Sequence, residues 1–265
     1  MVYLLPYVEQ DALYKAWQFR PSLYKRYYRD PLNAPQSLGA INSPPTPPGV
    51  YPVSPNLKTF KCPSAAPDAG GQFGTIRMQT GGQPGRDYPA TYGLNPYTAY
   101  IVAGSPSAST QSAYGRTNYL AMMGYGTADA DGETYKGMFP YKNGTRIVTI
   151  SDGTSNTVAF LESAGGFIDF GGGPGWVGNG FAMSAQLSAF GTCPDPTNDA
   201  ASGGNCDFSS KGRGFAYGLP SSMHTNNRIN VVFGDGSVRS ISPTINFSVY
   251  AYICGIADGQ VVTFD

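Results

Sequence analysis

The sequence predicts an α+β fold, in which a short N-terminal helix packs on an antiparallel β-sheet with long Pro- and Gly-rich loops. Gly and Pro number 35 and 22 among 265 residues, which indicates many turns and little helix. One helix-like pattern lies near the N-terminus, and β-branched or aromatic runs follow it. The segments between the loops are too short for cores of their own, so residues 1–265 are predicted to form a single domain.

The predicted helix covers about residues 7–18. After Pro6, the side chains of Val8, Ala12, Leu13 and Trp17 fall near helical spacing, and no other convincing helix is visible. The proline-rich residues 29–58 and the Gly-rich residues 65–87 are predicted loops. The predicted strands are residues 117–126, 145–150, 156–163, 228–234, 237–242 and 260–264.

Two of these strands are predicted to form a hairpin. Asp235 and Gly236 separate them, and a two-residue Asp-Gly turn suits a type I′ hairpin. Because side chains alternate along a strand, we expect Ile229, Val231 and Phe233 to face one side of the sheet.

Charge and hydropathy exclude two classes of partner. Lys and Arg number 17 and Asp and Glu number 17, so the net charge is zero and nucleic acid is not an expected partner. Residues 1–265 hold no run of 18 apolar residues and no secretory leader, so no membrane span is predicted within them.

The four cysteines predict disulfides. Because they lack C-x-x-C spacing and the chain holds one histidine, a structural zinc site is disfavoured. Cys193 and Cys206 bracket a polar loop that a bridge would close, and Cys62 with Cys254 is the other candidate pair. Disulfides in turn favour an extracytoplasmic location.

The single histidine, His224, has two interpretations. It is either a loop residue that hydrogen-bonds a backbone carbonyl, or a general base beside Ser221 or Ser222 as nucleophile. There is no G-x-S-x-G elbow, and the hairpin turn already explains Asp235. We therefore assign no catalytic residue and do not expect an enzyme.

Three further segments are candidate binding sites. Asp129, Asp131 and Glu133 form either an exposed acidic turn or part of a calcium site, although the other ligands of an EF-hand are missing. Asp152 and Asn156 lie in a segment dense in turn formers, with ligand binding as the alternative.

The Gly-rich segment 171–181 carries two large rings, Trp176 and Phe181. These rings either pack in a core or form a stacking surface for sugars or for a neighbouring subunit.

Five segments carry a family resemblance in order along the chain. They are LLPYVEQDALY (4–14), FKCPS (60–64), TNYLAMMG (117–124), ISDGTSNTVAFLES (150–163) and HTNNRINVVFGDGSVRSIS (224–242). The chain resembles the DUF1559 proteins, which are abundant in planctomycetes and are similar to type II secretion pseudopilins and type IV pilins. This resemblance implies that residues 1–265 are a pilin-like globular head, and that the hydrophobic helix that would insert in the membrane is absent from this sequence.

The family's C-terminal signature is a histidine, nine residues and then Asp-Gly. His224, Asp235 and Gly236 match it, except that ten residues intervene here, which weakens a fixed geometry between His224 and Asp235. No cofactor is expected from the residues, and calcium is the alternative that the resemblance implies, since pseudopilin heads often bind calcium in a loop.

The function expected from the sequence is that of a structural head in an extracytoplasmic pilin-like filament or secretion assembly. Its partners would be other pilin-like subunits, in a homo-oligomer or filament. A cell-surface carbohydrate-binding module is the alternative function, and a hydrolase is the third and least favoured function.

Overall fold

The structure is a computed structural model of residues 1–265. It describes residues 1–19, 52, 55–65, 77–79, 99–101, 115–124, 136–140, 145–164, 166–169, 174–177, 179–180, 185–187, 220–226 and 228–263, and the side chains of β1, β2 and β6–β9 are outside this description. The described helices are the 3₁₀-helices η1 (Val2–Val8), η4 (Lys58–Phe60) and η5 (Ile147–Thr149) and the α-helices α1 (Asp11–Ala16) and α4 (Phe247–Cys254). The described strands are β1 (Arg77–Gln79), β2 (Ala99–Ile101), β3 (Arg116–Thr117), β4 (Tyr119–Gly124), β5 (Val158–Glu162), β6 (Gly166–Asp169), β7 (Pro174–Val177), β8 (Asn179–Gly180), β9 (Ala185–Leu187), β10 (Ile229–Phe233) and β11 (Val238–Ile241).

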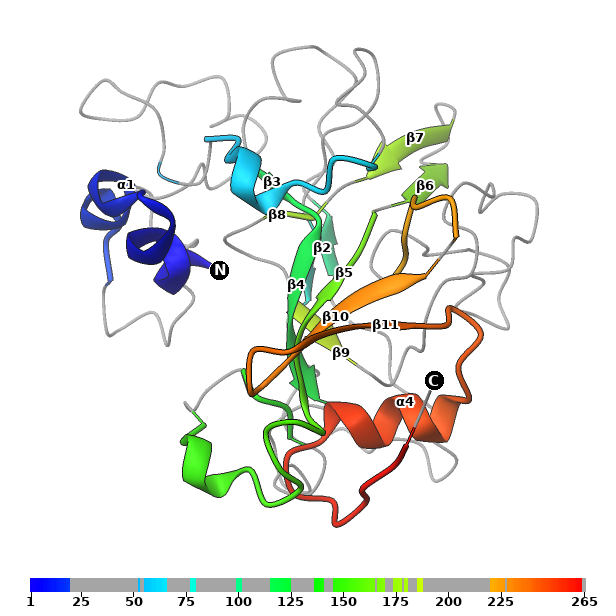
Figure 1. Ribbon diagram of the computed structural model, residues 1–265. Coiled ribbons are helices and arrows are strands. Elements are labelled where there is room, and N and C mark those ends of the chain that lie inside the picture. The colour runs from blue at the N-terminus through cyan, green and yellow to red at the C-terminus, as the bar shows by residue number, and fades with distance from the viewer. Residues whose placement is uncertain are drawn as a thin grey trace.

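The main sheet has the strand order β11-β10-β5-β4-β9. The first four strands are antiparallel neighbours, and β9 joins β4 in parallel. Three two-stranded pairs, β1-β2, β3-β8 and β6-β7, accompany this sheet (Figure 1). Helices and a largely antiparallel sheet confirm the predicted α+β class.

One face of the sheet packs against α4. In β10 the side chains of Ile229, Val231 and Phe233 are buried and their neighbours are half-buried, which confirms the predicted alternation. They share an apolar core with Tyr250 and Ile253 of α4. Since α4 contacts β4 and β5, it forms the helical layer of the fold.

Helix α4 was missed by sequence reasoning. The residues FSVYAYIC are β-branched or aromatic at most positions, a composition typical of strands. The helix begins because Asn246 caps it: its side-chain oxygen accepts hydrogen bonds from the backbone N–H of Ser248 and of Val249. Tertiary packing of Tyr250, Ile253 and Cys254 then offsets the weak helix propensity.

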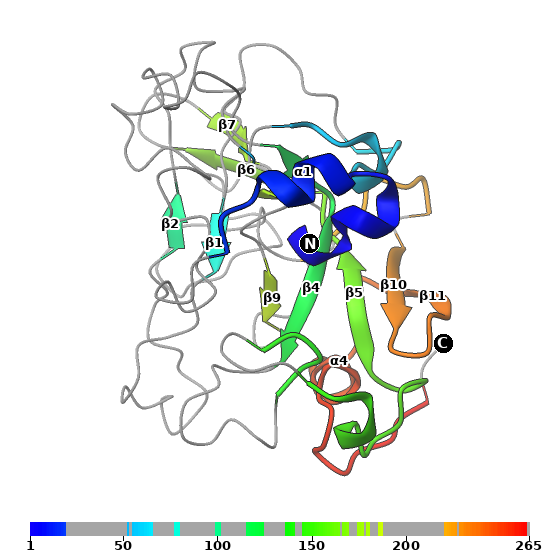
Figure 2. The ribbon, with the colours of Figure 1, turned by 90° about the vertical axis from the view of Figure 1, so that its left-hand side faces the viewer.

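The predicted N-terminal helix is shorter and packs differently. Residues 2–8 are a 3₁₀-helix, and Glu9 adopts a left-handed conformation with φ of 60° before α1 begins. None of the residues of α1 is buried, whereas Val2, Leu5 and Trp17 around it are. The helix that packs on the sheet is therefore α4. In Figures 1 and 2, α4 lies at the opposite end of β4 and β5 from residues 55–65.

Two predicted strands are wrong in their described residues. Residues 145–150 contain η5, where the side chains of Ile147 and Val148 are 71% and 88% exposed, so they line no buried face. Residues 260–263 are irregular. In both segments the β-branched residues pair with no strand among the described residues, and β propensity alone does not form a strand.

The predicted hairpin forms, but its turn differs. Gly236 has φ of +85°, whereas Asp235 is not in the left-handed region that a type I′ turn requires. The N–H of Gly236 donates to the carbonyl of Phe233 at 3.0 Å, and the N–H of Phe233 donates to the carbonyl of Ser237 at 2.9 Å. The loop therefore has three residues, Gly234 to Gly236, and ends in a glycine bulge.

The predicted disulfide between Cys62 and Cys254 is wrong. Both side chains are buried free thiols. Cys254 ends α4 inside the apolar core, whereas Cys62 follows η4 near the other end of the sheet (Figure 1). A disulfide needs α-carbons less than about 7 Å apart, and the sheet separates these two positions.

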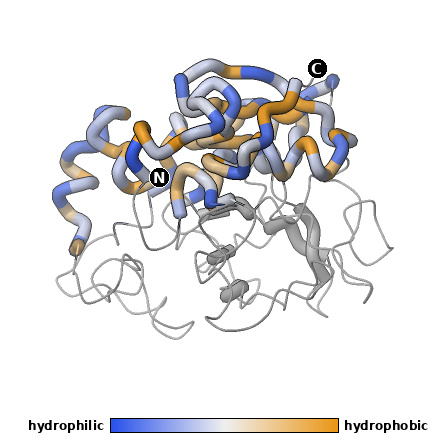
Figure 3. The backbone as a smooth tube through the Cα atoms, turned by 90° about the horizontal axis from the view of Figure 1, so that it is seen from below, coloured by the Kyte–Doolittle hydropathy of each residue, from blue (hydrophilic) through white to orange (hydrophobic). Residues whose placement is uncertain are grey.

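Apolar and polar residues interleave along the described chain, as the hydropathy colouring in Figure 3 shows. Among the described residues, no helix is both long and apolar enough to cross a bilayer.

Candidate functional site

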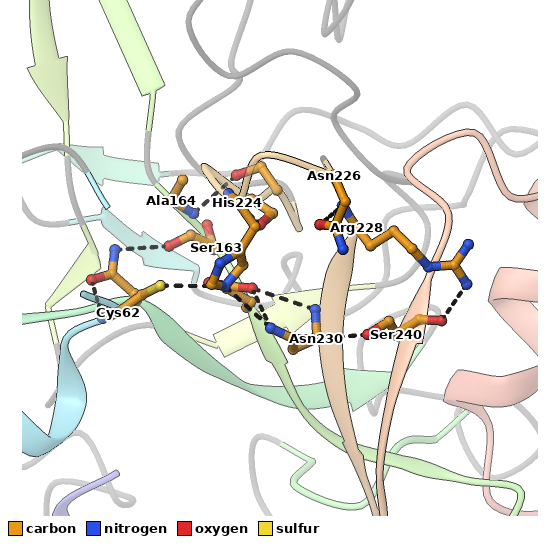
Figure 4. A network of polar contacts seen from close by, with 12 residues as sticks. Cys62, Ser163, Ala164, His224, Asn226, Arg228, Asn230 and Ser240 are labelled. Carbon is orange, nitrogen blue, oxygen red and sulfur yellow. Dashed lines mark hydrogen bonds and ion pairs between the residues drawn. The ribbon is translucent and has the colours of Figure 1, made fainter. Parts of the chain in front are cut away.

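Three potential metal ligands from distant parts of the chain meet beside the sheet. Nε2 of His224 lies 3.2 Å from Oε1 of Glu162 and 3.6 Å from Sγ of Cys62. The three ligand atoms lie within 4.8 Å of one another. In Figure 4 the sulfur of Cys62, the ring of His224 and the amide of Asn230 point toward one another.

Cys62 is held in place by Asn118, which lies between β3 and β4. The side-chain oxygen of Asn118 accepts the backbone N–H of Cys62 at 2.9 Å, and its amide nitrogen donates to the carbonyl of Ser163 at 3.2 Å. The backbone of Asn118 also bonds Phe60 and Ser163, at 2.8 and 2.7 Å. The loop that carries Cys62 is thereby attached to the end of β5.

Glu162 is the last residue of β5, and only 1% of it is exposed. Its Oε2 atom accepts hydrogen bonds from the backbone nitrogen and from Nδ2 of Asn230, at 3.4 and 3.3 Å. Asn230 is oriented in turn by Ser240, whose hydroxyl donates to Oδ1 at 2.9 Å. This arrangement leaves Oε1 of Glu162 to face His224.

His224 lies on the segment before β10, and two serines hold that segment. The hydroxyl of Ser222 accepts the backbone N–H of His224 at 3.1 Å, and the hydroxyl of Ser221 accepts the backbone N–H of Ala164 at 3.0 Å. Both serines are buried and bond the backbone, so the predicted pairing of either hydroxyl with the imidazole as a nucleophile is not formed. The contacts of the imidazole among the described residues are made by Nε2 with side chains, and the predicted bond to a backbone carbonyl stays a prediction.

The site disfavours an ionised thiol. Burial raises the pKa of Cys62, and its hydrogen bond with Glu162 raises it further. Burial also raises the pKa of Tyr119 nearby, with added repulsion from Cys62 and Glu162. A protonated thiol is a poor nucleophile, because the thiolate is the reactive form.

The three residues do not have the geometry of a Cys-His-Glu catalytic triad. A triad uses one imidazole nitrogen for the nucleophile and the other for the carboxylate. Here the sulfur of Cys62 and the carboxylate of Glu162 both approach Nε2 of His224. This arrangement instead brings three potential metal-ligand atoms within 4.8 Å of one another.

The other two signature residues lie apart from this site. Asp235 and Gly236 form the tip of the hairpin, at the far end of β10 from His224. One carboxylate oxygen of Asp235 accepts a hydrogen bond from the backbone N–H of Ser237 at 2.8 Å. The backbone N–H of Asp235 donates to the carbonyl of Thr154 at 3.1 Å. Both residues shape the turn and dock it on the loop before β5.

Asp152 and Asn156 also hold the backbone together. The buried carboxylate of Asp152 accepts the N–H groups of Asp258 and Gly259 at 2.8 and 3.1 Å. Asn156 donates from Nδ2 to the carbonyl of Asp152 at 2.9 Å. These bonds tie the segment after α4 to the loop before β5, and a ligand-binding role for the two side chains stays a prediction.

Several predicted residues fall outside the described part of the chain. Trp176 lies in β7, in register with Phe167 of β6, and its side chain is not described. The glycan-stacking role therefore stays a prediction. The residues outside the described ranges are Asp129, Asp131, Glu133, Phe181, Cys193 and Cys206.

Sequence reasoning placed His224 in a signature but did not find its partners. Cys62 was assigned to a disulfide, and Glu162 was not singled out. The available signal was that Cys62, Glu162 and His224 lie in three of the segments that carry the family resemblance. Nothing in the local sequence pattern brings those segments to one point.

The comparison with protein families matches residues 1–248 to the family described as "Protein of unknown function (DUF1559)". The chain belongs to the DUF1559 family. Thus the family identified from the sequence is confirmed over most of the chain, while its description assigns no activity. No curated protein and no solved structure matches the DUF1559 chain.

Proposed function

We propose that this DUF1559 chain is the globular head of a pilin-like or pseudopilin-like subunit in an extracytoplasmic filament or secretion assembly. Support comes from the resemblance of the family to pilins and from the surface of the molecule. The single observation that carries the proposal is a pair of exposed apolar surfaces at opposite ends of the sheet.

The first surface, here the aromatic surface, consists of Tyr3 and Tyr7 of η1. Their side chains are 53% and 85% exposed, and the ring of Tyr3 stacks on Phe19 with centroids 5.6 Å apart. Large exposed rings are typical of protein contacts, because they bury much area at little cost in conformational entropy.

The second surface, here the aliphatic surface, consists of Ile147 and Val148 of η5. In Figures 1 and 2, η5 lies at the α4 end of the sheet, whereas η1 lies toward the other end. Two different patches at opposite ends suit a head-to-tail contact between copies, and such contacts build open filaments when the rotation does not close.

A photo-crosslinking experiment in the native host tests this proposal. A photoreactive phenylalanine analogue is placed at Tyr7 or at Val148 in the full-length gene product, and crosslinked copies are detected by immunoblot. We expect both positions to give dimers and higher ladders of this chain. A second change, Val148→Asp, should abolish the crosslinks from position 7, because a charge in the aliphatic surface opposes its burial.

Val261 provides the matched control, since it is 64% exposed and apolar but lies in the segment after α4. The same analogue at position 261 should give few crosslinks between copies. The proposal is wrong if positions 7 and 148 yield no crosslinked copies, or if position 261 yields as many.

A further inference from the structure

We propose that Cys62, Glu162 and His224 form a three-residue binding site for a zinc-class transition-metal ion, with Asn230 as a positioning residue. The inference concerns a site apart from the aromatic and aliphatic surfaces, and it does not depend on the proposed assembly.

Two of the three distances between the ligand atoms match those around a tetrahedral ion, and the third, between Cys62 and Glu162, is within 4.8 Å. Zinc binds sulfur at about 2.3 Å and nitrogen or oxygen at about 2.05 Å, so tetrahedral angles separate S from N by about 3.5 Å and N from O by about 3.3 Å. The corresponding distances are 3.6 Å from Cys62 Sγ to His224 Nε2 and 3.2 Å from His224 Nε2 to Glu162 Oε1. His224 therefore lies at zinc-like distances from both of the other ligands.

The hydrogen bonds at His224 cannot all be satisfied by one proton arrangement. Nε2 lies 3.2 Å from a carboxylate oxygen of Glu162, which accepts, and 3.2 Å from Nδ2 of Asn230, which donates. A protonated Nε2 suits only the carboxylate, and an unprotonated one suits only the amide. Rotating the side-chain amide of Asn230 by half a turn would place its oxygen beside Oε2 of Glu162, and two acceptors would then face each other. The hydrogen bond to Oε2 therefore determines the amide orientation.

A metal ion removes this conflict. The lone pair of Nε2 and the Oε1 oxygen of Glu162 would then both face the cation, and Nδ2 of Asn230 would donate to Oε2 alone. A carboxylate whose second oxygen is held by hydrogen bonds is the usual supporting arrangement at a metal site. Because Ser240 holds Asn230, the supporting bonds are present before the ion binds.

The ligand set and its charge select the class of ion. Thiolate and imidazole suit zinc and its neighbours, whereas calcium and magnesium take oxygen ligands. On binding, a bond forms between the metal and Sγ of Cys62, and the thiol proton passes to solvent. The thiolate and the carboxylate then balance the two positive charges, so the buried site is neutral.

The position of the site also indicates its structural effect. The three ligands come from the loop after η4, from the end of β5 and from the segment before β10. The side chain of His224 is 31% exposed, compared with 2% for Glu162, so the side of His224 is open to a water molecule as fourth ligand. A bound ion would link three segments that are distant in sequence.

Cobalt titration of the metal-free protein tests the site. Co²⁺ replaces zinc at such sites, and a thiolate ligand gives a charge-transfer band in the near ultraviolet. We expect this band at one equivalent in the wild-type chain, together with a higher Tm on addition of Zn²⁺. The variant Cys62→Ser should lose the band. Cys254→Ser, which changes the other described free thiol, should keep it.

Two further variants keep the test independent of folding defects. His224→Gln changes a partly exposed side chain, and it should weaken Zn²⁺ binding by at least about 100-fold while the far-ultraviolet circular dichroism stays unchanged. Asn230→Ala should weaken binding by about 10–100-fold and still show the full thiolate band at saturation, because it removes a support and no ligand.

The proposal would be overturned by either of two results. One is a wild-type chain that shows no stoichiometric Co²⁺ band and no rise in Tm with Zn²⁺. The other is a band that survives in Cys62→Ser, which would assign the thiolate to another cysteine. Neither result bears on the crosslinks between copies, so the two proposals fail separately.

Discussion

Asn230 donates two hydrogen bonds to the buried carboxylate of Glu162, one from its backbone nitrogen and one from its side chain, at 3.4 and 3.3 Å. Together with the backbone pairing of β10 with β5, these bonds join the two strands at one end of the sheet. A carboxylate with so little exposure is stabilised only if its oxygens keep their donors.

Glu162→Ala should destabilise the metal-free protein by about 1–3 kcal/mol, because it removes the buried carboxylate oxygen that accepts both hydrogen bonds from Asn230. Glu162→Gln should cost less, since its amide oxygen can still accept one of these bonds. Urea denaturation in the presence of a chelator measures both variants. Equal stability of the alanine and glutamine variants would show that these hydrogen bonds contribute nothing.

The pairing of the cysteines can be checked directly. We expect peptide mapping of the oxidised, folded protein under non-reducing conditions to find no peptide that joins Cys62 to Cys254, because both are free thiols in the fold. A crosslinked peptide of that pair, recovered in high yield, would contradict the arrangement of η4 and α4 about the sheet.

Gly236→Ala should destabilise the protein by about 1–2 kcal/mol. Gly236 has φ of +85°, and a side chain in that conformation is strained. The added Cβ atom would meet no neighbour within 4 Å, so the strain of the backbone is the only cost. Gly236→Asn is the matched control and should lose less, because asparagine tolerates this region better. Thermal unfolding measures both, and an alanine variant as stable as the wild type would contradict the observed turn.

Asp258 should make stability depend on pH. Burial raises the pKa of Asp258 from 3.8 to about 6, and the neighbouring Asp152 adds to the shift. The folded protein therefore holds this proton more tightly than the unfolded chain, so the stabilising contribution is complete below about pH 4 and is lost as the pH rises through about 6.

The variant Asp258→Asn removes this loss. The Tm of the variant minus the Tm of the wild type should therefore be larger at pH 8 than at pH 4. Thermal unfolding between pH 4 and 8 measures the difference, and a constant difference between the two proteins across this range would refute the shift.

Local sequence patterns determined the alternation in the hairpin strand, the presence of its turn and the family of this protein. The alternation of Ile229, Val231 and Phe233 is a property of neighbouring residues, and a buried strand displays it wherever it lies. Gly236 likewise predicted a turn, although the loop length and turn type depended on how the hairpin docks on the loop before β5. The family, too, was recognisable from short segments in order.

Only the tertiary structure decided which helix covers the sheet and which residues meet His224. The β-branched and aromatic residues of α4 favour a strand locally, and their burial against β4 and β5 overrides that preference. Cys62, Glu162 and His224 lie on segments far apart in sequence, and hydrogen bonds from the backbone and side chains of Asn118 and Ser221 join these segments. The contact among these three residues depends on the path of the whole chain. The spacing of residues within any one segment does not encode that path.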